Sequence, residues 1–293
     1  YPGSIVFLSE HAPPERRALF TSWPVIGAFM GFLLGNGAAA ILGGMIGDEA
    51  LQQWGWRIPF LLGALIALGG AVFRRHMSEP PTLGRLEMHG DIPFVEAVRD
   101  YWPQILQIIC LTLSLAVGFY LMLVYASSYL TEYMHISTSS AFDINTYALM
   151  IMIPILAFGA LVSDRIGRKP LLYTSTIGTL FLSWPLWSLM HHQNAYLIFA
   201  GQAGFAALFA IGYAALSSAM VEALPSHVRC SGVAIGYNLC QGLFGGTAPL
   251  VATYLLARTA DDFAPVYYLM ITAVISTIAV YTLKETAGKP LPD

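Results

Sequence analysis

The chain has 293 residues, of which 56% are hydrophobic and 11% are charged. Soluble domains average about 25% charged residues, so this composition excludes an ordinary soluble domain. Several nearly uncharged runs approach the ~20 residues that a helix needs to cross a bilayer. They predict an all-α, multi-pass integral membrane protein instead of a transmembrane barrel, whose strands would alternate polar and apolar residues. The net charge of −3 excludes no further class.

The chain begins with an apolar stretch, residues 3–9, that is too short to span a membrane. Because no initiator Met precedes it, we interpret it as the remnant of a helix whose start is absent, and the sequence as an N-terminally truncated fragment. A polar link with two consecutive prolines follows at 10–17.

Eight complete spans follow, assigned by their apolar length and by the charges between them. They cover residues 18–46, 58–73, 105–130, 144–162, 171–190, 196–221, 232–256 and 266–283. The longest polar stretch, 74–100, contains two consecutive prolines and charges of both signs. We therefore expect a surface linker there, with room for a short amphipathic helix.

A tight charged turn separates two of these spans. Both flanking runs are too apolar for water, so the turn must lie at a membrane surface. Its charged and small residues are Asp164, Arg165, Gly167, Arg168 and Lys169. Short cytoplasmic loops collect Lys and Arg, which favours the cytoplasmic side. By itself, the turn is also consistent with an ordinary positively charged loop.

The distribution of positive charge gives an orientation. If the charged turn is cytoplasmic, alternate loops must be cytoplasmic too. Twelve Lys and Arg then lie on that side, and two, Arg57 and Arg258, lie on the other. This bias supports the number of spans and predicts a cytoplasmic C-terminus.

A motif of Glu, Pro and Arg occurs twice, at positions offset by 212 residues (10 to 222). The two copies are Glu10, Pro13 and Arg17, and Glu222, Pro225 and Arg229. Each copy leaves one span and precedes a Gly-rich span, whose small residues allow close helix packing. Two copies at matched places predict two parallel halves.

The charged turn, 164–170, resembles the signature loop of the major facilitator superfamily of secondary transporters. In that family the loop lies between helices 2 and 3 and, in a looser form, between helices 8 and 9. Counted from the repeat, the spans here correspond to helices 5 to 12 of a twelve-helix bundle. The resemblance implies a remnant of the N-terminal half at 1–75, a cytoplasmic linker at 76–101, and a six-helix C-terminal half at 102–293.

Three further stretches, 9–23, 54–60 and 237–249, resemble the metabolite:proton symporter branch of that superfamily. The branch carries proline, glycine betaine, 2-oxoglutarate, citrate and shikimate. The resemblance therefore implies proton-coupled uptake of a small polar metabolite, either an organic acid or a zwitterion such as proline or betaine. Residues 127–129 read Ser-Ser-Tyr where the branch often has Pro-Thr-Tyr, so the resemblance does not name the solute.

Solute transport needs a polar site near the middle of the membrane. The spans 105–130, 196–221 and 232–256 offer uncharged polar side chains, which can bind a solute without burying an unpaired charge. The candidates are Tyr125, Gln202, Tyr213, Asn238 and Gln241. We expect Tyr125, Tyr213 and Asn238 to line a shared cavity. The alternative, that these side chains only hold helices together, stays open.

Other chemistry is weakly represented in the sequence. No Asp, Glu, Lys, Arg or His lies in the middle of a complete span, so the family resemblance would place the proton carrier in the absent helices.

The three cysteines have neither metal nor redox spacing, and we expect no metal and no cofactor. The expected partners are the solute, protons and the lipid bilayer, with no nucleic acid, and we expect a monomer.

Two other functions remain open. An integral-membrane enzyme would need a metal or acid–base cluster, and no motif for one appears. A transport-inactive product of a truncated transporter gene is the stronger alternative, because carriers with parallel halves bind solute between them. We favour a secondary transporter of the cell inner membrane that works by alternating access and is not an enzyme.

Asp164 has a specific expected role. It opens the charged turn, where water would keep its carboxylate ionised. The start of the span after the polar link presents free N–H groups and the positive end of a helix dipole. We expect Asp164 to dock there, near residues 18–22, and to act as a latch on the cytoplasmic gate. A surface ion pair with Arg168 is the alternative.

Overall fold

A computed structural model describes residues 1–47, 50–75 and 93–292, and within these ranges every regular element is a helix. We call residues 1–75 the N-terminal part and residues 93–292 the C-terminal part. In chain order the elements of the N-terminal part are α1 (Pro2–His11), η1 (Pro14–Arg16), α2 (Arg17–Ile46), η2 (Leu51–Gly55) and α4 (Arg57–Arg74). Those of the C-terminal part are α6 (Pro93–Asp100), α7 (Trp102–Phe119), η3 (Tyr120–Tyr125), α8 (Ala126–Glu132), α9 (Thr138–Ile166), α10 (Arg168–Met190), α11 (Ala195–Glu222), α12 (Ser226–Leu239), η4 (Cys240–Gly245), α13 (Ala248–Thr259) and α14 (Ala264–Thr282).

The predicted spans agree with these helices. Within the described residues, 7 continuous helical stretches are long and apolar enough to cross a membrane. The remaining predicted span, 171–190, forms α10, which has 23 residues but is rich in Ser, Thr and Trp and is therefore less apolar. An all-α membrane fold with about eight spans is thus confirmed.

Two of the membrane spans contain a π-helical segment in their interior, and a third segment of this kind, η2, precedes α4. In the first, η3 joins α7 to α8, and in the second, η4 joins α12 to α13. A π-helix leaves one extra residue in a turn and is frequent at functional sites. These segments therefore mark the middles of both spans as places where backbone geometry departs from a regular helix.

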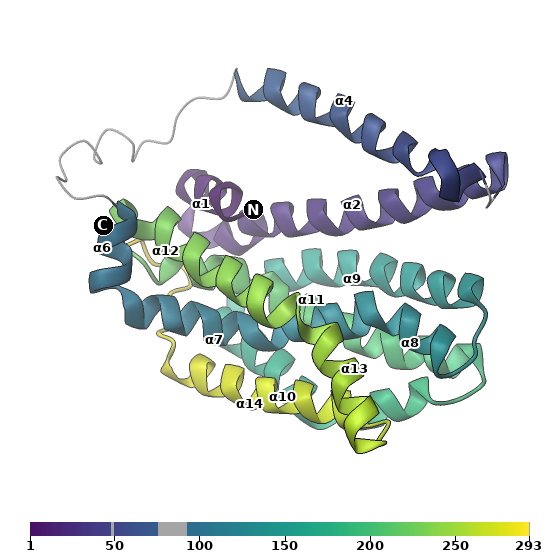
Figure 1. Ribbon diagram of the computed structural model, residues 1–293. Helices are drawn as coiled ribbons and strands as arrows, with labels where there is room; N and C mark the ends of the chain where they lie inside the picture. The colour runs from purple at the N-terminus through teal and green to yellow at the C-terminus, as the bar shows by residue number, and fades with distance from the viewer. Residues whose placement is uncertain (48–49, 76–92, 293) are drawn as a thin grey trace.

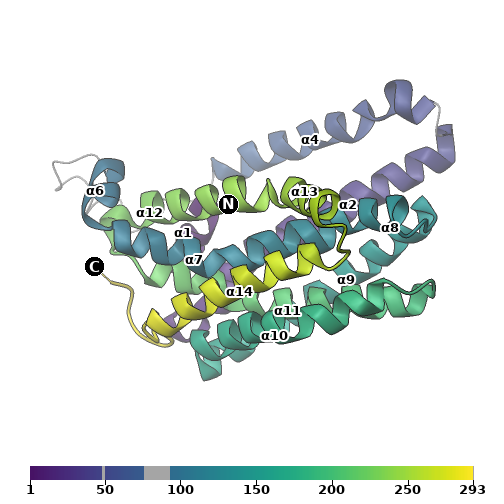
Figure 2. The ribbon, with the colours of Figure 1, turned by 60° about the horizontal axis from the view of Figure 1, so that its bottom comes forward.

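The C-terminal part is a compact bundle with α11 at its centre. Small residues on α11, among them Gly201 and Gly212, let α10 and α7 approach closely. Helix α10 packs against α11 and also against α14 (Figure 2). The α11 side chains are almost all buried, because neighbouring helices surround it on several sides.

The N-terminal part is more open. Helix α2 lies along α9 and α11, whereas α4 extends away from the bundle after the turn that follows α2 (Figure 1). The α4 side chains include large exposed apolar residues such as Phe60 and Ile66. Such a surface suits lipid or further apolar helices, not water.

The predicted linker, 76–101, lies partly outside the described residues. Its last portion forms α6, which packs against α12. His227 Nε2 lies 3.1 Å from Glu96 Oε1 and fixes this contact. The expectation of a short helix in the linker is therefore confirmed for 93–100.

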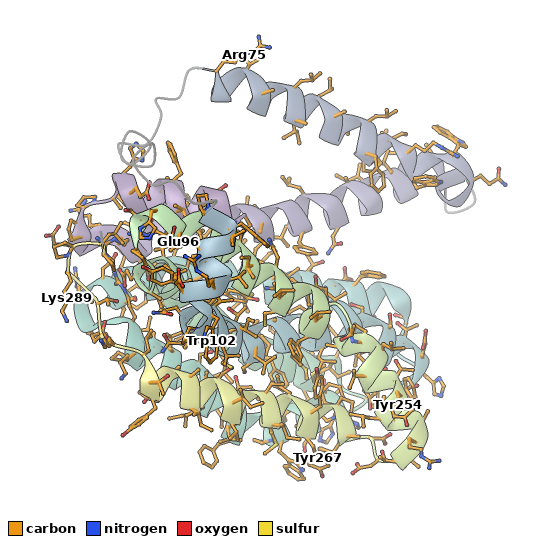
Figure 3. The ribbon with its side chains drawn as sticks, turned by 60° about the vertical axis from the view of Figure 1, so that its left-hand side comes forward. Arg75, Glu96, Trp102, Tyr254, Tyr267 and Lys289 are labelled. Atoms are coloured by element: carbon orange, nitrogen blue, oxygen red, sulfur yellow. The ribbon has the colours of Figure 1, made fainter. Side chains whose placement is uncertain are left out.

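Exposed aromatic residues lie near both ends of the bundle. Trp102 begins α7 at the end that carries α6, and Tyr254 and Tyr267 lie toward the opposite end (Figure 3). All three are exposed. Amphipathic rings at span ends are typical of membrane–water interfaces.

Replacement of Gly201 by Ala tests the close packing of α11. A Cβ at Gly201 would lie 2.5 Å from the carbonyl oxygen of Leu186, which belongs to the α10 backbone. We expect Gly201→Ala to lower the free energy of unfolding by about 1–3 kcal/mol, measured by denaturation in mixed micelles. Gly69→Ala on α4 is the control, since nothing lies within 4 Å of the position that a Cβ would take there. Equal effects of the two changes would contradict the packing.

Candidate functional site

Six buried charged side chains meet at the end of the bundle that also carries α6 and the C-terminus. They come from the polar link, the charged turn and the α11–α12 junction. We call them the charged network: Glu10, Arg17, Asp164, Arg168, Glu222 and Arg229. Each has a side-chain exposure of 6% or less. Charged side chains are almost never this buried unless they are paired.

The two copies of the sequence repeat exchange partners within this network. Arg17 Nη1 donates to Glu222 Oε1 at 2.8 Å, and Arg229 Nη1 donates to Glu10 Oε1 at 2.9 Å. Each arginine of one copy thus pairs with the glutamate of the other. The N-terminal and C-terminal parts are joined twice by the same chemistry.

The prolines of the repeat give both copies the same local geometry. Pro13 has φ −59° and ψ 144°, and Pro225 has φ −68° and ψ 159°; each is the N-cap of the helix that follows. Proline fixes φ near −65°. The matching φ values therefore follow from the sequence.

Arg168 is the hub of the network. Its Nη2 donates to Glu222 Oε1 at 3.1 Å, and its Nη1 donates to Asp164 Oδ1 at 2.9 Å and to the Ser163 carbonyl at 3.0 Å. Several hydrogen bonds per charge are what a buried ion pair needs to offset its loss of hydration. Removal of one partner would leave another charge uncompensated.

Asp164 makes the contact expected from the sequence. Its carboxylate accepts hydrogen bonds from the backbone N–H of Ala18 at 2.8 Å and of Leu19 at 3.0 Å. These are the free donors of the first turn of α2, where the helix dipole favours a negative charge. The pairing with Arg168 is present at the same time, so the two alternatives coexist.

The segment after α14 covers the network. The carbonyl oxygen of Lys289 accepts from Arg17 at 3.1 Å, and that of Pro292 accepts from Arg229 at 2.7 Å. Figure 3 shows Lys289 at this end of the bundle. We call residues 283–292 the tail. The sequence did not predict the role of the tail, because any residue can supply a backbone carbonyl as hydrogen-bond acceptor. Such contacts require no particular residue types.

Glu285 anchors the tail to the charged turn. Its carboxylate accepts from the backbone N–H of Arg168 and Lys169, both at 3.0 Å. Gly167 makes this possible, since its φ is +109° and an added Cβ would lie 2.6 Å from Glu285 Oε2. Burial alone would raise the pKa of Glu285, but backbone hydrogen bonds from Arg168, Lys169, Ala287 and Thr286 outweigh it and lower the pKa.

The other residues of the charged turn differ in role. Lys169 Nζ donates to the carbonyl oxygens of Leu283 at 2.8 Å and Tyr281 at 3.2 Å, at the C-terminus of α14. A cation is favourable at that end of a helix dipole. Arg165 is exposed and lies outside the network.

Deeper in the bundle, tyrosines from α1, α11 and α12 meet. Tyr1 packs against Tyr237 with ring centroids 4.6 Å apart and ring planes tilted by 35°, and its hydroxyl lies 2.8 Å from Ser217 Oγ. Gln241 Nε2 donates to the Tyr237 hydroxyl at 3.0 Å, and Gln241 also interacts with Tyr213. We call Tyr1, Tyr213, Ser217, Tyr237 and Gln241 the tyrosine cluster.

The other predicted solute-binding residues lie apart from this cluster. Gln202 is buried and donates to Asn145 Oδ1 at 2.7 Å and to the Met122 carbonyl at 3.1 Å. The Tyr125 hydroxyl accepts from Thr253 at 3.3 Å. Asn238 is exposed on α12. The structure thus groups Tyr213 with Gln241, and a cavity shared by Tyr125, Tyr213 and Asn238 stays a prediction.

A cavity of about 190 Å³ lies between α2, the α7–η3–α8 span and α9, toward the end opposite the charged network. It is lined by Phe32, Asn36, Phe119, Leu123, Val124, Ser127, Ser128, Phe142, Asn145 and Leu149. None of the five predicted solute-binding residues is among them, although Asn145 bonds to Gln202. Sequence reasoning missed this site, because its polar residues are small and scattered over three spans.

Comparison with known proteins gives a consistent picture. The sequence model of the Major Facilitator Superfamily matches residues 1–249. The glycine betaine/proline/ectoine/pipecolic acid transporter OusA of Dickeya dadantii is 31% identical over 303 residues, which cover 99% of this chain and 60% of that protein. The proline/betaine transporter of Escherichia coli K12 is 30% identical with the same coverage. The chain therefore spans about 60% of the length of these relatives.

Solved structures support the fold. The proton:xylose symporter XylE, bound to 6-bromo-6-deoxy-D-glucose, matches with a TM-score of 0.78 at 17% identity. The match covers 98% of this chain and 68% of XylE. At this identity the likeness concerns the fold alone.

The anchor formed by Glu285 predicts a pH dependence of the tail. Because the pKa of Glu285 is lower in the folded state than its ordinary value of 4.5, the contact is fully formed above that value and is lost as the pH falls through the folded pKa. A spin label at Pro290→Cys should be immobile at neutral pH and become mobile on acidification. With Glu285→Gln as well, the label should already be mobile at neutral pH. An immobile label in that variant would show that Glu285 does not hold the tail.

Proposed function

Because the chain belongs to the major facilitator superfamily, we propose that the protein is a secondary transporter that moves a small polar metabolite together with protons by alternating access. The observation that carries this proposal is the charged network, which ties the N-terminal part to the C-terminal part at one end. Carriers of this kind work by moving two such parts against each other around a site between them. A closed end held by breakable contacts is what that motion requires.

The network can act as a reversible closure. Its links between the two parts are Arg17 to Glu222, Arg229 to Glu10, and Asp164 to the start of α2. All are directional and short, so a small movement of α1 and α2 together against the C-terminal part breaks them. Opening this end would hydrate the charges, and hydration offsets part of the lost interaction energy. The two states can therefore lie close in free energy.

We further propose that the carrier lies in the inner membrane of the cell. The end of the bundle with the charged network then faces the cytoplasm. The twelve-to-two distribution of Lys and Arg supports this orientation. The C-terminus is then cytoplasmic, and the cavity near Ser127 opens toward the outer side. In the same arrangement, residues 1–75 belong to the N-terminal half, 76–101 to the linker, and 102–293 to the C-terminal half.

The solute we propose is an organic acid or a zwitterion such as proline or betaine. The relatives named above are transporters of glycine betaine and proline, which favours the zwitterion. Coupling to protons is supported by the resemblance to the metabolite:proton symporter branch. Lipid is the expected surrounding, and we propose a monomer as the working unit.

Uptake of labelled solutes tests the proposed function. Cells that lack their own betaine and proline carriers should accumulate labelled glycine betaine or proline when they express this protein, and a protonophore should abolish the accumulation. Citrate and 2-oxoglutarate serve as competing organic acids. Expression in the membrane without uptake of any of these solutes would reject the proposal in favour of a transport-inactive product.

Asp164→Asn tests the latch. The amide keeps the shape but loses the charge at the start of α2, which is worth up to about 2 kcal/mol in a partly buried site, or about thirtyfold in a two-state equilibrium. The network end should open more often. A cysteine at Gln241, in a background without native cysteines, should then react faster with a reagent from the cytoplasm and slower from outside.

The matched control is Arg165→Gln, which removes an exposed charge one residue away and outside the network. It should leave both reaction rates as in the parent. If Asp164→Asn also leaves both rates unchanged, Asp164 holds the two parts together without controlling which end is open.

A further inference from the structure

The cavity between α2, η3, α8 and α9 is lined by uncharged residues of two kinds, polar and aromatic, together with aliphatic side chains. None of its ten lining residues is ionisable. Four carry hydroxyl or amide groups: Asn36, Ser127, Ser128 and Asn145. Three others carry phenyl rings: Phe32, Phe119 and Phe142. Polar donors and aromatic faces therefore meet in one space with no formal charge.

One polar group of the lining is buried without a hydrogen-bond partner, and a second has amide N–H groups that remain for an acceptor. Ser127 has only 9% of its surface exposed, and its Oγ has no hydrogen-bond partner in the described structure. Asn145 is 6% exposed, and its Oδ1 is occupied by Gln202 Nε2, which leaves the Asn145 amide N–H groups for another acceptor. Buried polar groups are nearly always satisfied in folded proteins. An acceptor inside the cavity would satisfy both.

We propose that this cavity binds the solute of the proposed transporter, and that it selects a zwitterion whose cation carries methyl or alkyl groups, such as a quaternary ammonium carboxylate. The assignment rests on the proposed function. The carboxylate of such a solute would accept from Ser127, Asn145 and Asn36. Its cation, which has no N–H to satisfy, would lie against the phenyl rings.

The absence of charge in the lining decides between solute classes. A di- or tricarboxylate would bring a net negative charge into a site with no counter-charge, and a buried charge without a partner is strongly disfavoured. A zwitterion brings both signs and no net charge. The organic acids carried by the wider branch are therefore poor ligands for this cavity.

The aromatic residues decide between kinds of cation. A quaternary ammonium group is attracted to the face of an aromatic ring and needs no hydrogen-bond acceptor. A primary ammonium has three donors, and the lining offers no carboxylate to receive them. Glycine should thus bind more weakly than its trimethylated form.

An aromatic partition separates the cavity from the tyrosine cluster. Phe29 packs edge-to-face on Tyr213 with centroids 5.7 Å apart, and it contacts Phe119 at the same distance. Phe119 in turn contacts Phe32 at 5.4 Å. Since Phe119 lines the cavity and Tyr213 belongs to the cluster, these rings lie between the cavity and the tyrosine cluster. A solute bound here is held on the opposite side of the partition.

Equilibrium binding of radiolabelled glycine betaine to the purified chain in lipid nanodiscs tests the assignment. We expect glycine betaine to be displaced by its own unlabelled form, but at least tenfold less effectively by glycine or citrate. Ser127→Ala should raise the Kd about tenfold, since a hydrogen bond to a charged group is lost. Phe142→Leu should raise it several-fold through loss of the ring face.

Matched controls are available on the same or a neighbouring helix. Phe158→Leu changes an exposed Phe of α9 away from the cavity, and Ser188→Ala changes a half-buried Ser of α10 that does not line it. Both should leave the Kd unchanged. As a second measurement, bound glycine betaine should slow the labelling of a cysteine at Ser128 and leave that of a cysteine at Ser188 unaffected.

The outcomes separate the two levels of the proposal. If the parent protein takes up or binds none of the solutes, the proposed function itself fails. If glycine betaine binds but the Ser127 and Phe142 variants keep the parent Kd and Ser128→Cys is not protected, the cavity is not its site. Binding of citrate as tight as that of glycine betaine would overturn the selectivity for a zwitterion.

Discussion

The arrangement of this molecule depends on the carboxylate of Glu222, which lies between the guanidinium groups of Arg17 and Arg168. All three groups are almost inaccessible to water. They can be buried only while each has its partners, because an unpaired charge in such a place destabilises the structure by several kcal/mol. The partners come from the start of α2, the turn before α10 and the end of α11. These contacts therefore join the start of α2 to two helices of the C-terminal part.

The contacts of α2 change in character along its length. At its start they are charged and directional, through Asp164 and Arg17. Further along they are aromatic, where Phe29 and Phe32 meet Tyr213 and Phe119. Apolar contact is non-directional, so α2 can tilt at the aromatic region while the charged contacts are either made or broken. This contrast places directional contacts at the start of α2 and deformable contacts further along it.

The sequence predicted the chemistry of the network better than its connectivity. The contact of Asp164 with the start of α2 could be expected, because the positive end of a helix dipole attracts a nearby carboxylate. The exchange of partners between the repeats could not be predicted, since spacing along the chain does not say which Glu meets which Arg. The same limit applies to Gln202, whose buried partner, Asn145, lies on another span.

By itself, the sequence determined the all-α membrane fold, the positions of the spans, the repeat and the family. These follow from the lengths of apolar runs, from the charged residues between them and from local motifs of a few residues. Only the tertiary structure decided how the tail covers the network, which polar side chains face a cavity, and that Asn238 is exposed. Those features depend on backbone carbonyls and on side chains more than a hundred residues apart. Their proximity is fixed by helix packing, and no pattern along the chain encodes it.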